Sequence, residues 1–323
     1  MIRKIFKWLG SLLLLAVAAL FLWGYAADIP LPELKAKYAN AESEFVDLGD
    51  GLTVHLRDEG AVDAPAIILL HGSNASLHTW DEWVNRMKGE YRIIRFDQPG
   101  HGLTGPHPKG DYSVAAFANV IDRVAANRGL AKFTLGGNSM GGGIAYEYAK
   151  TYPDKLAGLI LVDAGGAPYA KPTALPIGFR IMQWPVVNQL ATVITPRSII
   201  DKSLRSSVSK AGYIDDAEVD LYWELLRRPG NREATVKRFG ERSVRPQEAS
   251  EPAPLATRAL ILWGEQDRLI PVSNAAWFAK RFPDSRTHIY RGIGHIPMQE
   301  IPDESARDVM AWMEEQQAPA TPQ

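Results

Sequence analysis

One short stretch, Gly137–Gly141, constrains the fold more than any other part of the chain, and its sequence is Gly-Asn-Ser-Met-Gly. It directly follows the apolar run Phe133–Leu135 and directly precedes a helix-like stretch, Gly142–Thr151. A serine can project from so tight a strand-to-helix turn only if the positions two residues before and after it lack a Cβ atom, which is what glycine provides. The pattern therefore predicts a nucleophile elbow with Ser139 as the reactive hydroxyl.

Two other kinds of glycine-rich loop, both of which bind nucleotides, do not fit this stretch. A phosphate-binding loop would end in Gly-Lys-Ser or Gly-Lys-Thr, which this stretch does not. A dinucleotide fingerprint would need a further glycine at the position of Tyr146. We therefore expect no nucleotide cofactor and indeed no cofactor at all.

Composition excludes several other functions. The 323 residues suffice for one domain of about 250 residues with an insertion. The formal net charge is −1, so no field strong enough to recruit nucleic acid is expected. The chain has no cysteine, which excludes disulfides, thiolate metal sites and cysteine nucleophiles. Histidines and carboxylates do not cluster at metal-ligand spacing, so no metal is expected either.

The N-terminal segment is predicted to be a membrane anchor or a signal peptide. Arg3, Lys4 and Lys7 precede an uncharged run, Trp8–Ala27, whose length at 1.5 Å per residue would cover about 30 Å of hydrocarbon. The basic flank predicts that the rest of the chain is exported, which in a Gram-negative cell means an inner-membrane anchor with the catalytic domain facing the periplasm. A cleaved signal peptide, giving a secreted or periplasmic protein, is the alternative.

Strand-like and helix-like stretches alternate along most of the chain, which predicts an α/β fold with a mostly parallel sheet and helices on both faces. The alternation stops between Gly165 and Pro254, where only helical stretches such as Ile177–Val193 and Asp215–Arg228 are recognisable. The predicted domains are an N-terminal anchor or signal, 1–28; a connector, 29–42; the α/β core, 43–165 and 255–315; an inserted helical lid, 166–254; and a disordered tail, 316–323.

A serine hydroxyl needs a base to take its proton and a third group to orient that base. His295 and Asp267 each follow a predicted strand, and the chain order Ser139, Asp267, His295 is the one that folds with a nucleophile elbow use. Asp163, after the preceding strand, is the rival orienting carboxylate. The oxyanion of the intermediate needs two backbone N–H donors, for which we expect Met140 and Ser73, with Asn74 as the alternative to Ser73.

These motifs together resemble the α/β-hydrolase family over about residues 43–315. The resemblance also rests on Leu70-His71-Gly72 and on the stretch Asp97–Gly102. It implies structural roles for His71, Asp97 and His101, and it implies that the insertion covers an acyl pocket. Dehalogenases and epoxide hydrolases are excluded because they have aspartate at the position of Ser139.

The resemblance suggests an ester hydrolase, a carboxylesterase or lipase, acting on lipid at a membrane, because similar anchored members include phospholipase A types. The expected partners are an acyl-ester or phospholipid substrate and the bilayer, with a homodimer through the N-terminal helix as a further expectation. Tyr222–Arg232 also resembles the lids of carbon-carbon bond hydrolases, so cleavage of a vinylogous diketone by the same triad is the alternative. Those enzymes usually have tryptophan after the catalytic histidine, whereas Ile296 follows here. A binding protein that has lost turnover is the alternative of another class.

All predicted catalytic residues lie beyond Leu70. A chain that starts near Ile29 is therefore expected to keep its activity on short, water-soluble esters.

Overall fold

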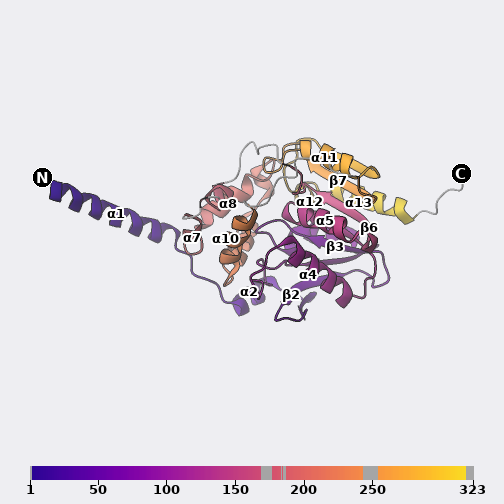
Figure 1. The fold of residues 1–323 in the computed structure, drawn as a ribbon, viewed down its shortest axis with the longest axis horizontal. Helices are drawn as coiled ribbons and strands as arrows, with labels where there is room; N and C mark the ends of the chain where they lie inside the picture. The colour runs from indigo at the N-terminus through magenta and orange to yellow at the C-terminus, as the bar shows by residue number, and fades with distance from the viewer. Residues whose placement is uncertain (1, 169–176, 183, 185–186, 243–253, 318–323) are drawn as a thin grey trace.

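The protein is built around one sheet, as shown by a computed structural model that describes residues 2–168, 177–182, 184, 187–242 and 254–317 (Figure 1). In this part of the chain the sheet has eight strands in the order β1-β2-β4-β3-β5-β6-β7-β8. The strands are β1 Ser43–Asp47, β2 Thr53–Glu59, β3 Ala66–Leu70, β4 Arg92–Phe96, β5 Phe133–Asn138, β6 Leu156–Val162, β7 Ala259–Gly264 and β8 Ser285–Tyr290.

Only the first two strands depart from a parallel arrangement. β1 and β2 form an antiparallel hairpin, and β2 pairs antiparallel with β4. The turn between β1 and β2 contains Gly49, Asp50 and Gly51, all with positive φ. From β4 to β8 every pairing is parallel, which places the carboxyl ends of these strands at one edge of the sheet. The predicted α/β fold with a mostly parallel sheet is confirmed.

Each face of the sheet packs against its own set of helices because side chains alternate along a strand. In β3, Ile68 and Leu70 belong to one buried cluster, whereas Ile67 and Leu69 belong to the other. The first cluster includes side chains of α4 Val114–Asn127, α5 Met140–Thr151 and α11 Ser273–Arg281, and the second includes side chains of α3 Asp81–Met87 and α13 Pro302–Gln317. Helices therefore cover both faces, as in other α/β proteins.

Within the described residues, the regular elements between β6 and β7 are all helices, and we refer to residues 166–254 as the lid. The stretch Ile177–Val193, expected as one apolar helix, contains two short helices instead. The helix from Asn231 was not anticipated. The described lid helices are α6 Ile177–Met182, α7 Val187–Leu190, α8 Arg197–Arg205, α9 Asp216–Leu226 and α10 Asn231–Arg242.

Both ends of the chain differ in part from expectation. The connector contains a helix, α2 Leu31–Tyr38, whose Leu34 packs in a small cluster with Leu103 and Leu225. Helix α13 extends two residues into the predicted tail, and the rest of that tail lies outside the described residues.

Helix α1, Ile2–Gly24, projects away from the rest of the protein at the lid end (Figure 1). Its Trp8 and Leu22 are 72% and 86% exposed. Within the described residues, no helix has the combined length and apolarity of a membrane span. The predicted transmembrane helix is therefore not confirmed and stays a prediction.

The turn between β5 and α5 has the form of the predicted elbow. Ser139 separates the strand from the helix and has φ 55° and ψ −115°, a region that a residue with a side chain rarely occupies. The glycines around it allow close packing. A Cβ atom added to Gly141 would lie 2.2 Å from the Leu70 carbonyl oxygen, and one added to Gly137 would lie 2.4 Å from the Gly141 carbonyl. The turn therefore cannot accept larger residues at these two positions without moving the backbone.

We expect Gly141→Ala to lower the free energy of unfolding by at least the roughly 1–3 kcal/mol typical of an overpacked core. The matched control is Gly240→Ala in α10, where an added Cβ meets no atom within 4 Å outside its own helix. The control should be neutral or slightly stabilising because alanine favours a helix over glycine. Denaturant unfolding of the detergent-purified proteins measures both changes, and equal losses would contradict the close packing at the elbow.

Candidate active site

A buried histidine and a carboxylate form a direct pair at the carboxyl edge of the sheet. Asp267 follows β7, and His295 follows β8. His295 Nδ1 lies 2.7 Å from Asp267 Oδ2. The other oxygen, Oδ1, accepts hydrogen bonds from the backbone N–H groups of Leu269, at 2.7 Å, and Ile270, at 3.1 Å. Such a carboxylate can hold the His295 proton on Nδ1, so that Nε2 is left as the basic nitrogen.

Ser139 and His295 line the same cavity, so the structure brings all three predicted triad residues to one place. The loop that carries His295 is fixed against the elbow. The side-chain amide of Asn138 donates to the carbonyl oxygens of Val162, at 3.2 Å, and His295, at 3.1 Å. The residue before the serine therefore connects the ends of β5 and β6 with the histidine loop.

Asp163, the rival carboxylate, lies next to the same pair. Ligand atoms of Asp163, Asp267 and His295 all lie within 4.8 Å of one another. Oδ1 of Asp163 accepts a 2.9 Å hydrogen bond from the Gly264 N–H. Burial, together with the negative charge of Asp267, raises the pKa of Asp163 well above its usual value. Burial therefore favours the protonated form of Asp163 more than that of an ordinary aspartate, and Asp267 is the group that contacts His295.

Asp163, Asp267 and His295 are residue types that can bind metal ions, but their geometry fits a hydrogen bond better than a metal site. The 2.7 Å contact between His295 Nδ1 and Asp267 Oδ2 is a hydrogen-bond distance. A metal bound by both atoms would have to lie between them, about 2 Å from each, and would break this contact. A metal would also need Asp163 in its charged form, which burial disfavours.

The two predicted oxyanion donors come from loops at the cavity. Met140 is the first residue of α5, so its N–H is one of those that a helix leaves without an intrahelical partner. Ser73 and Asn74 both line the cavity, and both amides remain candidates for the second donor. Asn74 has a φ of 61°.

His71 holds the loop that contains Ser73 and Asn74 in place. It is fully buried, and burial lowers its pKa to about 4, so the ring is neutral. The Gln98 N–H lies 3.0 Å from Nε2, which must therefore accept, so that Nδ1 donates to the Gly72 carbonyl at 2.8 Å. His71 thereby joins the loop after β3 to the loop after β4. His101 is also buried, with Nδ1 3.2 Å from the Pro99 carbonyl.

A second chain of serine, histidine and aspartate lies away from the cavity. His55 is fully buried, with Nδ1 2.7 Å from Asp97 Oδ2 and Nε2 2.9 Å from Ser43 Oγ. The Ser43 oxygen, however, also accepts from the Asn40 N–H, at 3.1 Å, and from Arg57 Nε, at 3.2 Å. Both of its lone pairs are occupied, so this hydroxyl is a poor nucleophile. The chain joins β1, β2 and β4.

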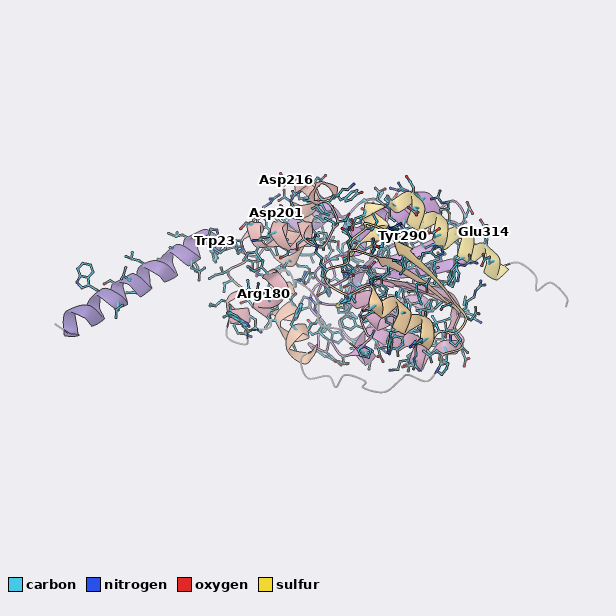
Figure 2. All side chains as sticks on the ribbon, turned by 90° about the horizontal axis from the view of Figure 1, so that it is seen from above. Trp23, Arg180, Asp201, Asp216, Tyr290 and Glu314 are labelled. Atoms are coloured by element: carbon cyan, nitrogen blue, oxygen red, sulfur yellow. The ribbon has the colours of Figure 1, made fainter. Side chains whose placement is uncertain are left out.

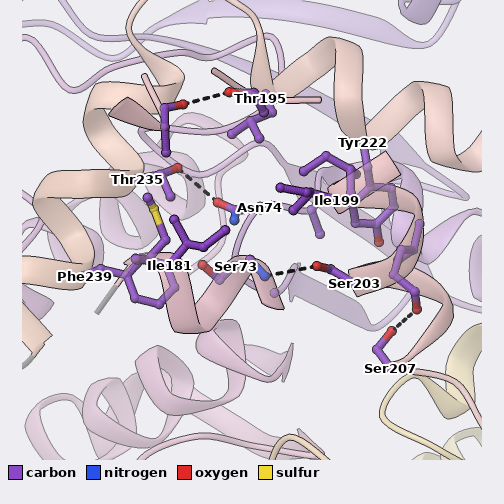
Figure 3. Close-up of a pocket in the computed structure, with 18 of the residues that line it drawn as sticks. Ser73, Asn74, Ile181, Thr195, Ile199, Ser203, Ser207, Tyr222, Thr235 and Phe239 are labelled. Atoms are coloured by element: carbon purple, nitrogen blue, oxygen red, sulfur yellow. Dashed lines mark hydrogen bonds between the residues drawn. The ribbon is translucent and has the colours of Figure 1, made fainter. Parts of the chain in front are cut away.

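The cavity in front of Ser139 has a volume of about 160 Å³. The lid supplies much of its wall, and Figure 3 shows lid residues such as Ile199, Tyr222 and Phe239 around it. Aliphatic and aromatic side chains dominate this wall. They include Ile181, Ile194, Ile199, Leu226, Phe239 and Leu269.

Two buried lid arginines near the site were not found from the sequence. Arg238 NH1 lies 3.3 Å from Ser73 Oγ and 3.3 Å from Met140 Sδ, and NH2 lies 3.2 Å from Asn74 Oδ1. Arg232 lines the cavity itself. Both belong to α10, a helix that the sequence pattern did not reveal, so no local signal could have placed them.

Comparison with known proteins gives consistent matches. Residues 67–308 match the sequence model of the alpha/beta hydrolase family. A 2-hydroxy-6-oxononadienedioate/2-hydroxy-6-oxononatrienedioate hydrolase from Comamonas testosteroni is 26% identical over 279 residues, which is 81% of this chain and 92% of that protein.

Solved structures agree in fold. A membrane phospholipase A, described as a bacterial virulence factor, matches with a TM-score of 0.71 and 24% identity, over 99% of this chain and 100% of that one. A thermophilic esterase from Thermogutta terrifontis matches with a TM-score of 0.70 and 22% identity, over 86% of this chain and 100% of that one.

Replacement by asparagine should affect the rate of ester hydrolysis very differently at Asp163 and at Asp267. Asp163→Asn keeps an oxygen that can accept from the Gly264 N–H, and Asp163 does not contact His295, so we expect hydrolysis of a soluble ester to stay within about tenfold. Asp267→Asn should lower the rate by about 10⁴-fold through loss of tautomer control. The reverse order of effects would make Asp163 the orienting acid.

A pH titration of stability gives an independent readout for the same pair. A carboxyl whose pKa is raised by folding keeps its proton in the folded state after the unfolded chain has lost it. The wild type should therefore lose stability relative to Asp163→Asn as the pH rises above about 4, the ordinary aspartate value. Thermal unfolding from pH 4 to pH 8 measures the difference.

Proposed function

The chain belongs to the alpha/beta hydrolase family, and on that basis we propose that it is a serine ester hydrolase in which Ser139, His295 and Asp267 form the catalytic triad. The observation that carries this proposal is the buried His295–Asp267 pair at the cavity that Ser139 also lines. A Ser139 hydroxyl in a strained, glycine-flanked turn supports it further.

In the proposed mechanism, Ser139 Oγ attacks the ester carbonyl carbon while His295 Nε2 takes the hydroxyl proton. Asp267 keeps the other imidazole proton on Nδ1 and stabilises the positive ring. The same proton then goes to the leaving alcohol, which departs and leaves an acyl group on Ser139. Water, deprotonated by His295, hydrolyses that acyl-enzyme.

The negative oxygen of each tetrahedral intermediate would be held by the N–H groups of Met140 and Ser73. Such donors typically contribute about 10²–10³ each in rate. Arg238 would fix the Ser73 loop from the lid, because it contacts both Ser73 and Asn74. Closure of the lid would thereby help to position the second donor.

For the substrate, we propose an ester with a long acyl chain, and glycerophospholipid or lysolipid as the leading class. The largely apolar wall of the cavity supports this, since such a wall suits an alkyl chain. The similarity to a membrane phospholipase A over 99% of this chain gives further support.

Carbon-carbon bond hydrolysis is the second candidate, because relatives named for that activity match most of the chain. Their named substrates are dicarboxylates, which need cationic partners. Among the described residues that line the cavity, Arg232 is the one lysine or arginine, and it already bonds Asp28. Ile296 also stands where those enzymes usually have tryptophan. Both observations favour the ester.

We also propose that α1 anchors the enzyme to a membrane, with the catalytic domain on the non-cytoplasmic side. The support comes from the uncharged run Trp8–Ala27, the basic residues before it, and the exposure of large apolar side chains such as Leu14 and Leu22. An exported enzyme freed by cleavage is the alternative.

Ser139→Ala should abolish ester hydrolysis, with a loss on the order of 10⁴-fold or more, because it removes the nucleophile. A fluorophosphonate probe should label the wild type at Ser139, as identified by peptide mass spectrometry. Ser43→Ala is the matched control, because Ser43 also bonds a histidine that bonds an aspartate, and its labelling should be unchanged.

The same preparations decide between substrates. Wild type assayed on p-nitrophenyl esters, phospholipid and a vinylogous diketone should hydrolyse the esters. Turnover of the diketone alone would establish the second candidate. Absence of labelling and of all turnover would indicate a binding protein.

If α1 is a retained anchor, the full-length protein should sediment with membranes and resist extraction by carbonate or high salt, because screening charge does not undo burial of an apolar helix. Immunoblots of the membrane and soluble fractions measure this. A mature protein that begins at Ala27 or Asp28 and is found in the soluble fraction would overturn the anchor.

A further inference from the structure

The segment that follows α1 is hydrogen-bonded into the lid. Tyr25 forms an isolated antiparallel bridge with Ile194. On one side of the bridge, the Thr195 N–H donates to the Gly24 carbonyl at 2.8 Å. On the other side, the Ala26 N–H donates to the Val193 carbonyl at 3.1 Å. Gly24 and Ala26 are both buried, so this contact is part of the packed structure. Figure 2 shows Trp23, at this end of α1, beside the lid.

Arg232 connects the same segment to the cavity. Its side chain lines the cavity and is only 5% exposed. NH1 donates to the Ala26 carbonyl at 2.7 Å, and NH2 donates to Asp28 Oδ1 at 2.5 Å. The guanidinium thus binds two acceptors of the N-terminal segment, and the same residue forms part of the pocket wall. Removal of both acceptors would leave a buried charge without these partners, which is costly.

Gly24 lies directly behind the same wall. A Cβ atom added there would lie 2.5 Å from Ile194 Cγ2 and 3.3 Å from Pro196 Cδ. Ile194 and Pro196 both line the cavity. This stretch of the lid therefore lines the cavity and also packs against the end of α1.

We propose that residues 24–29 act as a latch on the lid, with Arg232 as the positioning residue, so that the placement of α1 sets which acyl chains the pocket accepts. This proposal rests on the proposed ester hydrolysis and assigns its acyl-chain selectivity. It also changes one expectation from the sequence. A chain that starts near Ile29 lacks the Ala26 carbonyl and Asp28, so it should not keep the wild-type pocket even though it keeps the triad.

Two glycines of α1 provide a matched test in the full-length, detergent-purified protein. Gly24→Ala should push Ile194 into the cavity. We expect the ratio of kcat/KM for p-nitrophenyl laurate to that for p-nitrophenyl butyrate to fall about tenfold, the size of effect that a one-carbon change in an apolar pocket produces. Gly10→Ala, where an added Cβ meets no atom within 4 Å, should leave the ratio unchanged.

Two arginines provide a second matched test. Arg232→Gln should change the laurate-to-butyrate ratio, and Arg232→Lys should change it less, because lysine keeps the charge and can reach one acceptor. Arg123→Gln is the control, since Arg123 of α4 likewise donates to a backbone carbonyl, that of Leu48 at 3.0 Å, and to an aspartate, Asp50 Oδ2 at 2.9 Å, but contacts neither the latch nor the cavity. It should leave the ratio unchanged. Because the readout is a ratio measured on the folded enzyme, a general loss of stability would not move it.

Hydrogen exchange of peptides that cover residues 187–204 adds a readout that does not need turnover. Exchange should rise in Arg232→Gln but not in Arg123→Gln. If both esters are hydrolysed and neither the ratio nor the exchange changes in Gly24→Ala and Arg232→Gln, the latch is wrong and the proposed function stands. If the wild type hydrolyses no ester, the proposed function and the acyl selectivity fail together, and unchanged exchange would overturn the latch as well.

Discussion

The site depends on the backbone of Ser139 being held in a conformation that it would not adopt alone. Residues in such regions cost of order 1–3 kcal/mol and persist only where surrounding structure fixes them. Here β5 pairs on both sides, with β3 and β6, up to the last residues before the serine. Helix α5 begins at the next residue, and Gly141 is packed against Leu70. A central strand and a buried helix therefore hold the turn, so Ser139 is placed by the buried centre of the sheet.

Two histidine–carboxylate pairs in this protein show what separates a reactive site from a structural one. Both have the same 2.7 Å contact between Nδ1 and a carboxylate oxygen. At His55 the serine oxygen accepts two further hydrogen bonds and belongs to a regular strand, β1. At His295 the serine belongs to a strained turn that faces a cavity. Reactivity thus follows from what surrounds the serine, and the pair itself does not distinguish the two.

What could be predicted from the sequence was local, and what could not be predicted depends on contacts between distant residues. The elbow, Asp267 and His295 each lie within a few residues of a strand end, where alternation of elements and turn glycines are visible. His55 carried no such signal, because its partners come from β1 and from the loop after β4. The lid was harder still. Its apolar residues line a cavity and follow no single helical face, so the break between α6 and α7 and the existence of α10 were not apparent.

The junction between α1 and the lid illustrates the same limit and carries a functional consequence. Ala26 and Arg232 are 206 residues apart in the sequence, and no local pattern indicates that they are in contact. From sequence, the N-terminal segment is separable from the catalytic domain because all triad residues lie beyond it. In the structure the segment supplies acceptors to a cavity-lining arginine and packs behind Ile194. Helix α1, proposed as the membrane anchor, packs against the cavity wall that is proposed to hold the acyl chain. Because protein interiors are closely packed, a displacement of the helix should also displace this wall.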